Sequence, residues 1–113
     1  MDTVDIVAVR ARLEEQRAAL DRSITILTGE RPATEGSVAD AGARLTDADR
    51  VEASLASLRQ QRAAVQAALD RIAAGGYGLC VSCGKPVPPG RLEARPEAAR
   101  CVPCQAKHDR MHH

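Results

Sequence analysis

Apolar residues recur along the second half of the chain in alternate steps of four and three. This row contains Val51, Leu55, Leu58, Val65, Leu69 and Ile72, with Arg62 as its one polar member. Such steps place side chains on one helical face and are typical of a coiled-coil seam. An earlier row with seven-residue spacing contains Ile6, Leu13, Leu20 and Leu27, with Val9 and Ile24 between them and Gln16 or Arg17 interrupting it. The pattern predicts two long amphipathic helices.

The segment between the two rows has the composition of a loop. Residues 28–43 are rich in Gly, Ala, Thr and Glu and contain Pro32, which disfavours a continuous helix. A connection of this kind joins antiparallel helices. We therefore expect a helical hairpin over residues 1–74, with a tip loop near residues 28–46.

The second helix has its own start and stop signals. Thr46 is a candidate N-cap with Asp49 three residues later, and Asp47 suits the positive end of the helix dipole. Gly75-Gly76 supplies a C-terminal stop. These signals predict a helix from about Asp47 to Ala74, roughly 42 Å long at 1.5 Å per residue.

Size and charge narrow the classes of protein that fit. A chain of 113 residues has room for one core, and 16 Lys and Arg balance 15 Asp and Glu. Tyr77 is the only aromatic residue, so platforms for base stacking are absent. The longest apolar runs are too short for a membrane span, and the first residues are acidic where a signal peptide is basic. We expect a cytoplasmic protein without a membrane segment.

Four cysteines dominate the chemistry of residues 75–113. Cys80 and Cys83 form one Cys-x-x-Cys pair, and Cys101 and Cys104 form a second after seventeen residues. This spacing is typical of tetrahedral zinc sites, and four thiolates leave no open position for catalysis. We expect a structural Zn²⁺; two disulfides or four unrelated thiols are the alternatives.

Neighbouring residues agree with such a site. Gly84 follows the first pair where the backbone must turn tightly, and Pro103 suits the first turn of a short C-terminal helix. His108 and His112 are four residues apart and are either further ligands or part of a solvated tail. Few large apolar residues lie beyond Gly76, so this module needs a metal to fold. The expected fold is mainly α: an antiparallel coiled-coil hairpin on a small four-cysteine zinc-finger module, residues 75–113, with a short C-terminal helix.

The zinc segment is recognisable. Residues 68–105, including "GGYGLC", "CVSCG" and "RLEARP", resemble the DksA/TraR zinc-finger family of bacterial transcription regulators. The resemblance implies a coiled-coil finger on a zinc-bearing base, and direct binding to RNA polymerase. In this family the finger enters the secondary channel of the polymerase, where acidic residues at its tip approach the catalytic region.

The family's tip motif is Asp, two residues, Asp, one residue, Ala. The best match here is "TDADRV", in which Asp49 and Arg50 fit the second Asp and its neighbour. Thr46 replaces the first Asp and Val51 the Ala, while Asp47 is a substitute acid. The resemblance thus points to Asp47, Asp49 and Arg50 as polymerase-contacting residues; helix capping alone is the alternative.

Some family members sense a guanosine alarmone at their interface with polymerase. Arg95 matches an arginine implicated in that site, and Arg91 lies in the same stretch, but Gln105 stands where those members have a basic residue. The structural alternative for Arg91 and Arg95 is an ion pair with Glu93 or Glu97 that ties the zinc loop to the hairpin.

Other functions stay open at this point. Residues 1–74 carry a net charge of −2 and residues 75–113 a net charge of +3. One alternative is a nucleic-acid-binding module that uses Lys85, Arg91, Arg95, Arg100, Lys107 and Arg110. Another is a helical adaptor that recruits a protein or dimerises through its seam. We expect a monomeric polymerase-binding regulator without specific DNA readout. An enzyme is not expected, because neither a nucleophile-base pair nor an open metal site can be identified.

Overall fold

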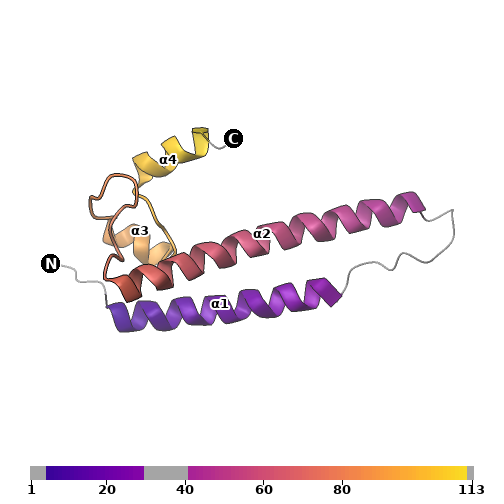
Figure 1. Cartoon of the computed structure of the whole chain (residues 1–113), viewed down its shortest axis with the longest axis horizontal. Helices are drawn as coiled ribbons and strands as arrows, with labels where there is room; N and C mark the ends of the chain where they lie inside the picture. The colour runs from indigo at the N-terminus through magenta and orange to yellow at the C-terminus, as the bar shows by residue number, and fades with distance from the viewer. Residues whose placement is uncertain (1–4, 30–40, 112–113) are drawn as a thin grey trace.

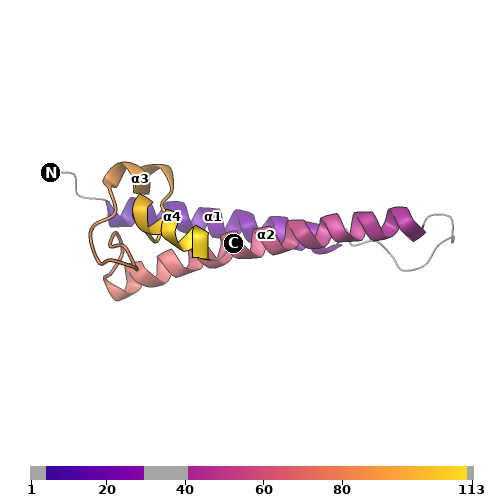
Figure 2. The same cartoon turned by 90° about the horizontal axis from the view of Figure 1, so that it is seen from above.

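The chain forms a long helical hairpin with a small module at one end. The computed structural model describes residues 5–29 and 41–111. Its helices are α1 (Ile6–Gly29), α2 (Ala41–Ala74), α3 (Pro89–Ala94) and α4 (Val102–Met111). Helices α1 and α2 lie side by side and form the finger, and residues 75–111 form the base module next to the start of α1 (Figures 1 and 2). The predicted mainly α fold is confirmed: within the described ranges the only β pairing is one bridge, Leu79 to Pro86.

The core of the finger lies between the two predicted rows. Leu13 and Leu55 are fully buried and Val65 is 3% exposed. Ala68 is also fully buried, although it is outside the predicted row. Its small side chain fits where α2 lies against α1. Ile6 is the exception in the first row, because it is 38% exposed at the beginning of α1.

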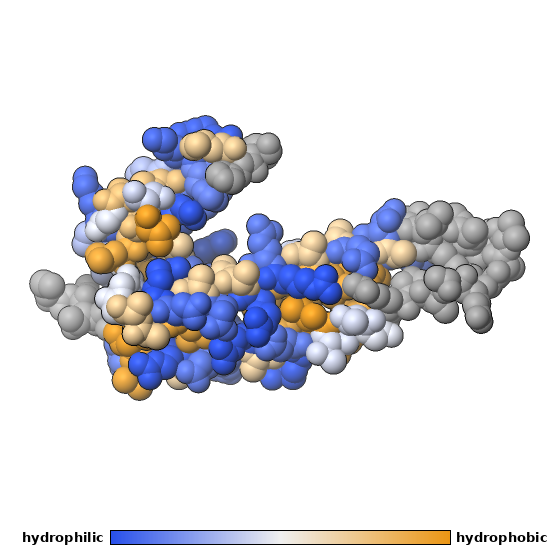
Figure 3. Space-filling view, viewed as in Figure 1, coloured by the Kyte–Doolittle hydropathy of each residue, from blue (hydrophilic) through white to orange (hydrophobic). Residues whose placement is uncertain are grey.

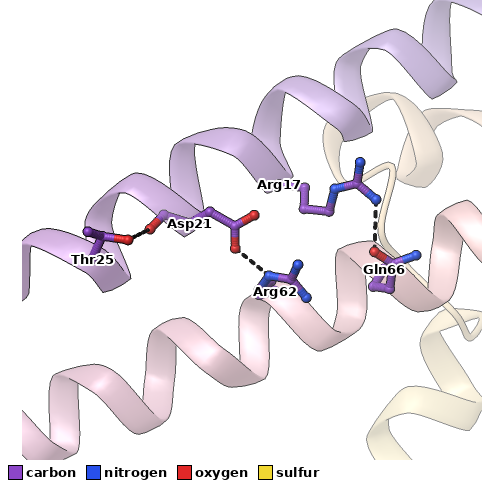
Figure 4. A network of polar contacts seen from close by, with 5 residues as sticks. All are labelled: Arg17, Asp21, Thr25, Arg62 and Gln66. Atoms are coloured by element: carbon purple, nitrogen blue, oxygen red, sulfur yellow. Dashed lines mark hydrogen bonds and ion pairs between the residues drawn. The ribbon is translucent and has the colours of Figure 1, made fainter. Parts of the chain in front are cut away.

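Polar side chains cross the seam at two neighbouring levels of the finger. Arg62 occupies the expected polar position and pairs with Asp21 of α1. One turn closer to the base, the Arg17 Nη1 donates to Gln66 Oε1 at 2.9 Å. Figure 4 shows both contacts bridging α1 and α2. Because they are partly solvated, these pairs add directional contacts between the helices rather than apolar burial.

The start of α2 corrects one prediction. The helix spans Ala41–Ala74 and has 34 residues, so Thr46 lies inside it and is not its N-cap. Asp47 and Asp49 therefore lie in the second and third turns rather than at the helix start. The capping pattern of Thr46 and Asp49 favoured a later start, although Asp40, directly before Ala41 in the sequence, is also of a type preferred at a helix N-cap. Residues 30–40 of the expected tip loop lie outside the described residues.

The end of α2 agrees with the prediction. Gly75 has φ of +84°, a conformation that favours glycine. Its N–H donates to the carbonyl of Ile72 at 3.2 Å, and the Gly76 N–H donates to that of Arg71 at 2.9 Å. This is a Schellman arrangement, which satisfies two carbonyls at the end of the helix and turns the chain into the base module.

Two local elements were not predicted. Asp5 caps α1, because its carboxylate accepts hydrogen bonds from the N–H groups of Val7 and Ala8 at 3.1 and 3.2 Å. The short helix α3 begins with Pro89, whose ring suits a first helical position. Asp5 and Pro89 are both residue types that favour a helix start, so these signals were present in the sequence. The six residues of α3 are too few for a hydrophobic period to appear.

The base module has a second, smaller core. Cys80, Val87 and Leu92 are its buried residues, and Ala98, Cys101 and Cys104 pack against them. Tyr77 packs against both this cluster and the core of the finger. Several other apolar residues are exposed, namely Leu79, Val81, Val102 and Met111. The apolar core is therefore small, as expected for a metal-dependent module. None of the described helices combines the length and the apolar character that crossing a bilayer requires.

Candidate functional site

The four cysteines converge at the base module. Their Sγ atoms all lie within 4.8 Å of one another, and those of Cys83 and Cys101 are 3.9 Å apart. A tetrahedral zinc site with Zn–S bonds of about 2.3 Å needs S···S separations of about 3.8 Å. The donor set therefore fits a zinc ion that is held only by protein thiolates. Such a site is closed, and its role is structural.

Two backbone turns present these thiols. In the first, Gly84 has φ of +77° and its N–H donates to the Cys80 carbonyl at 2.9 Å, while the Cys80 N–H donates to the Lys85 carbonyl at 2.8 Å. In the second, the Gln105 N–H donates to the Cys101 carbonyl at 2.9 Å as α4 begins. Cys104 lies in the first turn of α4, next to Pro103. The predicted positions of the glycine and the proline are confirmed.

The thiols differ strongly in acidity. Burial opposes ionisation of Cys80, but backbone N–H groups of Cys101, Cys83 and Ser82 favour its thiolate and lower its pKa to about 6. Side-chain hydrogen bonds with Cys101 and Cys80 raise the pKa of Cys104 to about 12. Four thiols this close do not all ionise without a cation between them. A divalent metal resolves this conflict, because it lets all four bind as thiolates.

His108 lies in the second half of α4 and is not part of the cysteine cluster, which is the one group of possible metal ligands among the described residues. His112 lies outside the described residues. The structure thus brings the four predicted cysteines together, and among the described residues no histidine belongs to their cluster.

The predicted tip residues lie on α2, far from the cysteines. Asp47, Asp49 and Arg50 are exposed, and Arg50 Nη1 is 3.9 Å from Asp47 Oδ1. From Asp47 to the end of α2 the helix rises by about 40 Å at 1.5 Å per residue. Figure 1 shows this part of α2 at the opposite end of the finger from the base module.

Arg91 and Arg95 lie at the base. Arg91 Nε donates to the Arg100 carbonyl at 2.8 Å, and Arg100 Nε donates to Ser82 Oγ at 3.1 Å. Arg91 therefore donates to a carbonyl, and not to the carboxylate of Glu93 or Glu97 that the structural alternative named. Arg95 is exposed.

A cleft of about 810 Å³ separates α4 from the middle of α2. Figure 3 shows the molecule hollowed between these two helices. Arg91 and Arg95 line it together with Glu97, Gln105 and Asp109. Both signs of charge are present, so the cleft is not a purely basic anion site.

Three side chains that the sequence did not predict hold residues 93–98: Arg12 and Arg71 from the finger, and Tyr77 from the beginning of the base module. Arg12 Nη1 donates to the Glu93 carbonyl at 2.6 Å, Tyr77 Oη to that of Pro96 at 2.9 Å, and Arg71 Nη2 to that of Ala98 at 3.4 Å. We call this set the base clamp. Arginines on helix surfaces are common, so the sequence carries no signal that singles these out.

Comparison with known proteins identifies the C-terminal segment. Residues 75–110 match the family model described as the prokaryotic dksA/traR C4-type zinc finger. Two curated relatives from strains of Caulobacter vibrioides, each named RNA polymerase-binding transcription factor DksA, are 44% identical over 46 residues. This match covers 41% of the chain and 32% of each relative, so it spans about a third of their length.

Solved structures extend the likeness to the finger. Transcription factor DksA2 from Pseudomonas aeruginosa has a TM-score of 0.78 and 29% identity, covering 96% of this chain and 86% of that one. The polymerase-binding regulator Dks from Chlamydia trachomatis has a TM-score of 0.64 and 22% identity, covering 96% and 94%. The second likeness shows the fold alone.

Proposed function

Because this chain belongs to the DksA/TraR zinc-finger family, we propose that it is a transcription regulator that binds bacterial RNA polymerase directly. The observation that carries the proposal is the likeness to DksA2, which covers both the finger and the base module. The curated relatives bear polymerase binding in their name. A protein with this role works in the cytoplasm as a regulator rather than as an enzyme.

In this proposal the finger enters the secondary channel of the polymerase. Helix α2 carries Asp47 and Asp49 on its exposed surface at the end remote from the base. A rigid helix keeps these carboxylates at a fixed distance from the base module, which is the part available to contact the outside of the polymerase. The two acids then act near the catalytic region, where carboxylates alter the local field around a metal-dependent reaction.

The structure favours this function over the two alternatives. For nucleic-acid binding, two of the six basic residues, Arg91 and Arg100, already donate within the module. For dimerisation through the seam, the apolar row is covered inside the hairpin, with Leu13 and Leu55 fully buried. We therefore propose a monomer without specific DNA readout.

The alarmone is a separate part of the proposal. Arg91, Arg95 and Arg100 line the cleft, but Arg91 and Arg100 already donate within the module, and the carboxylates of Glu97 and Asp109 line the same cleft. Acidic groups weaken the binding of a polyphosphate. We propose a regulator that acts on polymerase without requiring a guanosine alarmone.

Binding to immobilised core polymerase tests the main proposal. We expect micromolar or tighter binding that a secondary-channel competitor displaces. We compare the polymerase binding of Asp47→Asn/Asp49→Asn with that of Glu14→Gln/Glu15→Gln. The second variant removes the same charge from exposed sites near the base. Steep salt-dependent binding to DNA without polymerase would instead support the nucleic-acid alternative. No binding to polymerase at micromolar concentrations would overturn the proposal.

A further inference from the structure

The pair of Asp21 and Arg62 divides the apolar core of the finger. Arg62 is the one polar residue of the apolar row on α2, and its guanidinium turns to the carboxylate of Asp21 on α1 (Figure 4). The buried residues Leu13, Val65 and Ala68 form one cluster, which lies wholly on the base side of this pair. The half-buried residues that pack against the cluster lie on the same side, namely Val9, Leu20, Leu69, Ile72 and Tyr77. The cluster that begins at the base therefore ends at the level of the pair.

The finger has a smaller core on the tip side of the pair. Among the described residues there, Leu55 alone is buried, and it belongs neither to the basal cluster nor to the one around Cys80. Glu52 also takes part in a hydrogen-bonding or electrostatic contact on this side. The half-buried seam residues of the tip side are Ile24, Leu27, Val51 and Leu58. Because apolar burial is the main stabilising contribution to a helical hairpin, the tip-side core is the weaker of the two.

Polar contacts join the two helices where the basal cluster ends. The side chains of Arg62 and Asp21 are 40% and 48% exposed, so water and salt screen their attraction and it contributes little to stability. Next to them, Gln66 accepts a hydrogen bond from Arg17 at 2.9 Å and donates one to Asp70 at 3.0 Å, and these contacts lie on the base side. The base-side and tip-side cores are therefore coupled by a weak contact rather than by a continuous buried row.

On the tip side, α1 is the weaker of the two helices. Its residues 23–29 include four β-branched residues and end in glycine, and both features lower helix propensity. The hydroxyls of Thr25 and Thr28 bond to carbonyls within α1 at 2.9 and 2.7 Å, and Ile26 is 62% exposed, so these side chains do little to hold α1 against α2. Residues 54–60 of α2, which lie opposite, contain no β-branched residue and continue without a break into the base-side part of the helix.

We propose that the finger consists of two units that open separately: a base-side unit around Leu13, and a tip-side unit beyond Asp21 and Arg62. In the tip-side unit the end of α1 detaches from α2, while α2 stays helical. Asp47 and Asp49 therefore keep their places on a continuous helix when the unit opens. During entry into a confined channel, the end of α1 can then move aside without disturbing the base module. That consequence rests on the proposed polymerase binding, whereas the division of the finger does not.

Amide hydrogen exchange followed by mass spectrometry tests the proposal on the full, zinc-loaded chain. We expect residues 23–29 to exchange about tenfold or more faster than residues 9–20 of the same helix, while residues 54–60 of α2 keep their protection. Leu55→Ala removes the buried residue of the tip-side core. It should accelerate exchange in residues 23–29 by about tenfold or more and leave residues 9–20 within about threefold of the native chain. The proposal fails if Leu55→Ala accelerates both segments of α1 equally, or if residues 54–60 of the native chain open together with residues 23–29.

Arg62→Leu tests whether the polar pair causes the division. It makes the apolar row on α2 continuous, and the former partner on α1 stays half-exposed to water, so we expect a folded variant. Exchange in residues 23–29 should slow by about tenfold, and Leu55→Ala introduced into this background should now accelerate residues 9–20 as well. Arg59→Leu is the matched control, because it makes the same change at an exposed position of α2 and should leave the native pattern. The same exchange pattern in Arg62→Leu as in Arg59→Leu would show that the pair does not divide the finger and would overturn the proposal.

Discussion

Tyr77 Oη lies 2.9 Å from the carbonyl oxygen of Pro96 and donates a hydrogen bond to it within the base module, where that module meets the finger. The ring of the same residue packs against both apolar clusters, the one around Leu13 and the one around Leu92. One side chain therefore couples a core built from helical seams to a core built around cysteines.

Substitution of Tyr77 should weaken this joint in two steps. Tyr77→Phe keeps the ring and loses the hydrogen bond, at a cost of about 0.5–1.5 kcal/mol in the free energy of unfolding. Tyr77→Ala also removes the ring from both clusters and should cost about 3 kcal/mol or more. Urea unfolding followed by circular dichroism measures both. An alanine variant as stable as the phenylalanine variant would contradict the packing role.

The titration of Tyr77 provides a pH test. Burial raises the pKa of the phenol; Glu97 adds to this, while Arg71 and Arg12 oppose it. The ordinary value is about 10, so above this pH the unfolded chain ionises first. The contribution of the neutral phenol to stability is complete below that value and is lost as the pH rises through the folded-state pKa. Because Tyr77 is the only aromatic residue, ultraviolet absorbance of the phenolate follows it directly. A midpoint at or below that of the urea-unfolded chain would contradict its burial.

Metal binding should depend on all four cysteines. Cys101→Ser removes a thiolate from a set in which every Sγ lies within 4.8 Å of the others, so we expect tight zinc binding to be lost. Mass spectrometry under native conditions and Co²⁺ absorbance measure occupancy. His108→Ala is the control and should retain the metal, because His108 is not part of the cluster. Lost zinc in the histidine variant would show that the site has a fifth participant.

The sequence predicted those features that repeat or that require a special residue. Leu13, Leu55 and Val65 lie in periodic rows, and Gly75 and Gly84 occupy left-handed turns, so each carries its own local signal. The base clamp follows from how two distant segments meet, which no local pattern records. Arg12 is 81 residues from Glu93 in the chain, and its role becomes visible only in the folded molecule.

The start of α2 shows the limit of capping signals. Thr46 and Asp49 have the spacing of a capping box, yet the helix continues through them from Ala41. Helix boundaries depend on the sum of several weak propensities, so one good cap does not determine where a helix begins.

Seam substitutions should separate apolar from polar contributions to the finger. Leu55→Ala removes a fully buried side chain and should lower the free energy of unfolding by about 2–5 kcal/mol. Arg62→Ala breaks the solvated pair with Asp21 and should change stability much less. A double-mutant cycle with Asp21→Ala measures the pair itself. Equal losses from Leu55→Ala and Arg62→Ala would show that the polar network, rather than the apolar row, holds the finger together.

Neutralising the tip distinguishes a functional role of the acids from a capping role. In Asp47→Asn/Asp49→Asn both side chains are exposed within α2, and Asp47 makes only a 3.9 Å contact with Arg50. Because neither acid caps the helix, the free energy of unfolding should change by less than about 1 kcal/mol. Promoter output in a reconstituted transcription assay should change relative to the native chain, while Glu14→Gln/Glu15→Gln behaves like the native chain. Unchanged output would remove the acids from the mechanism, and a large loss of stability would restore capping as their role.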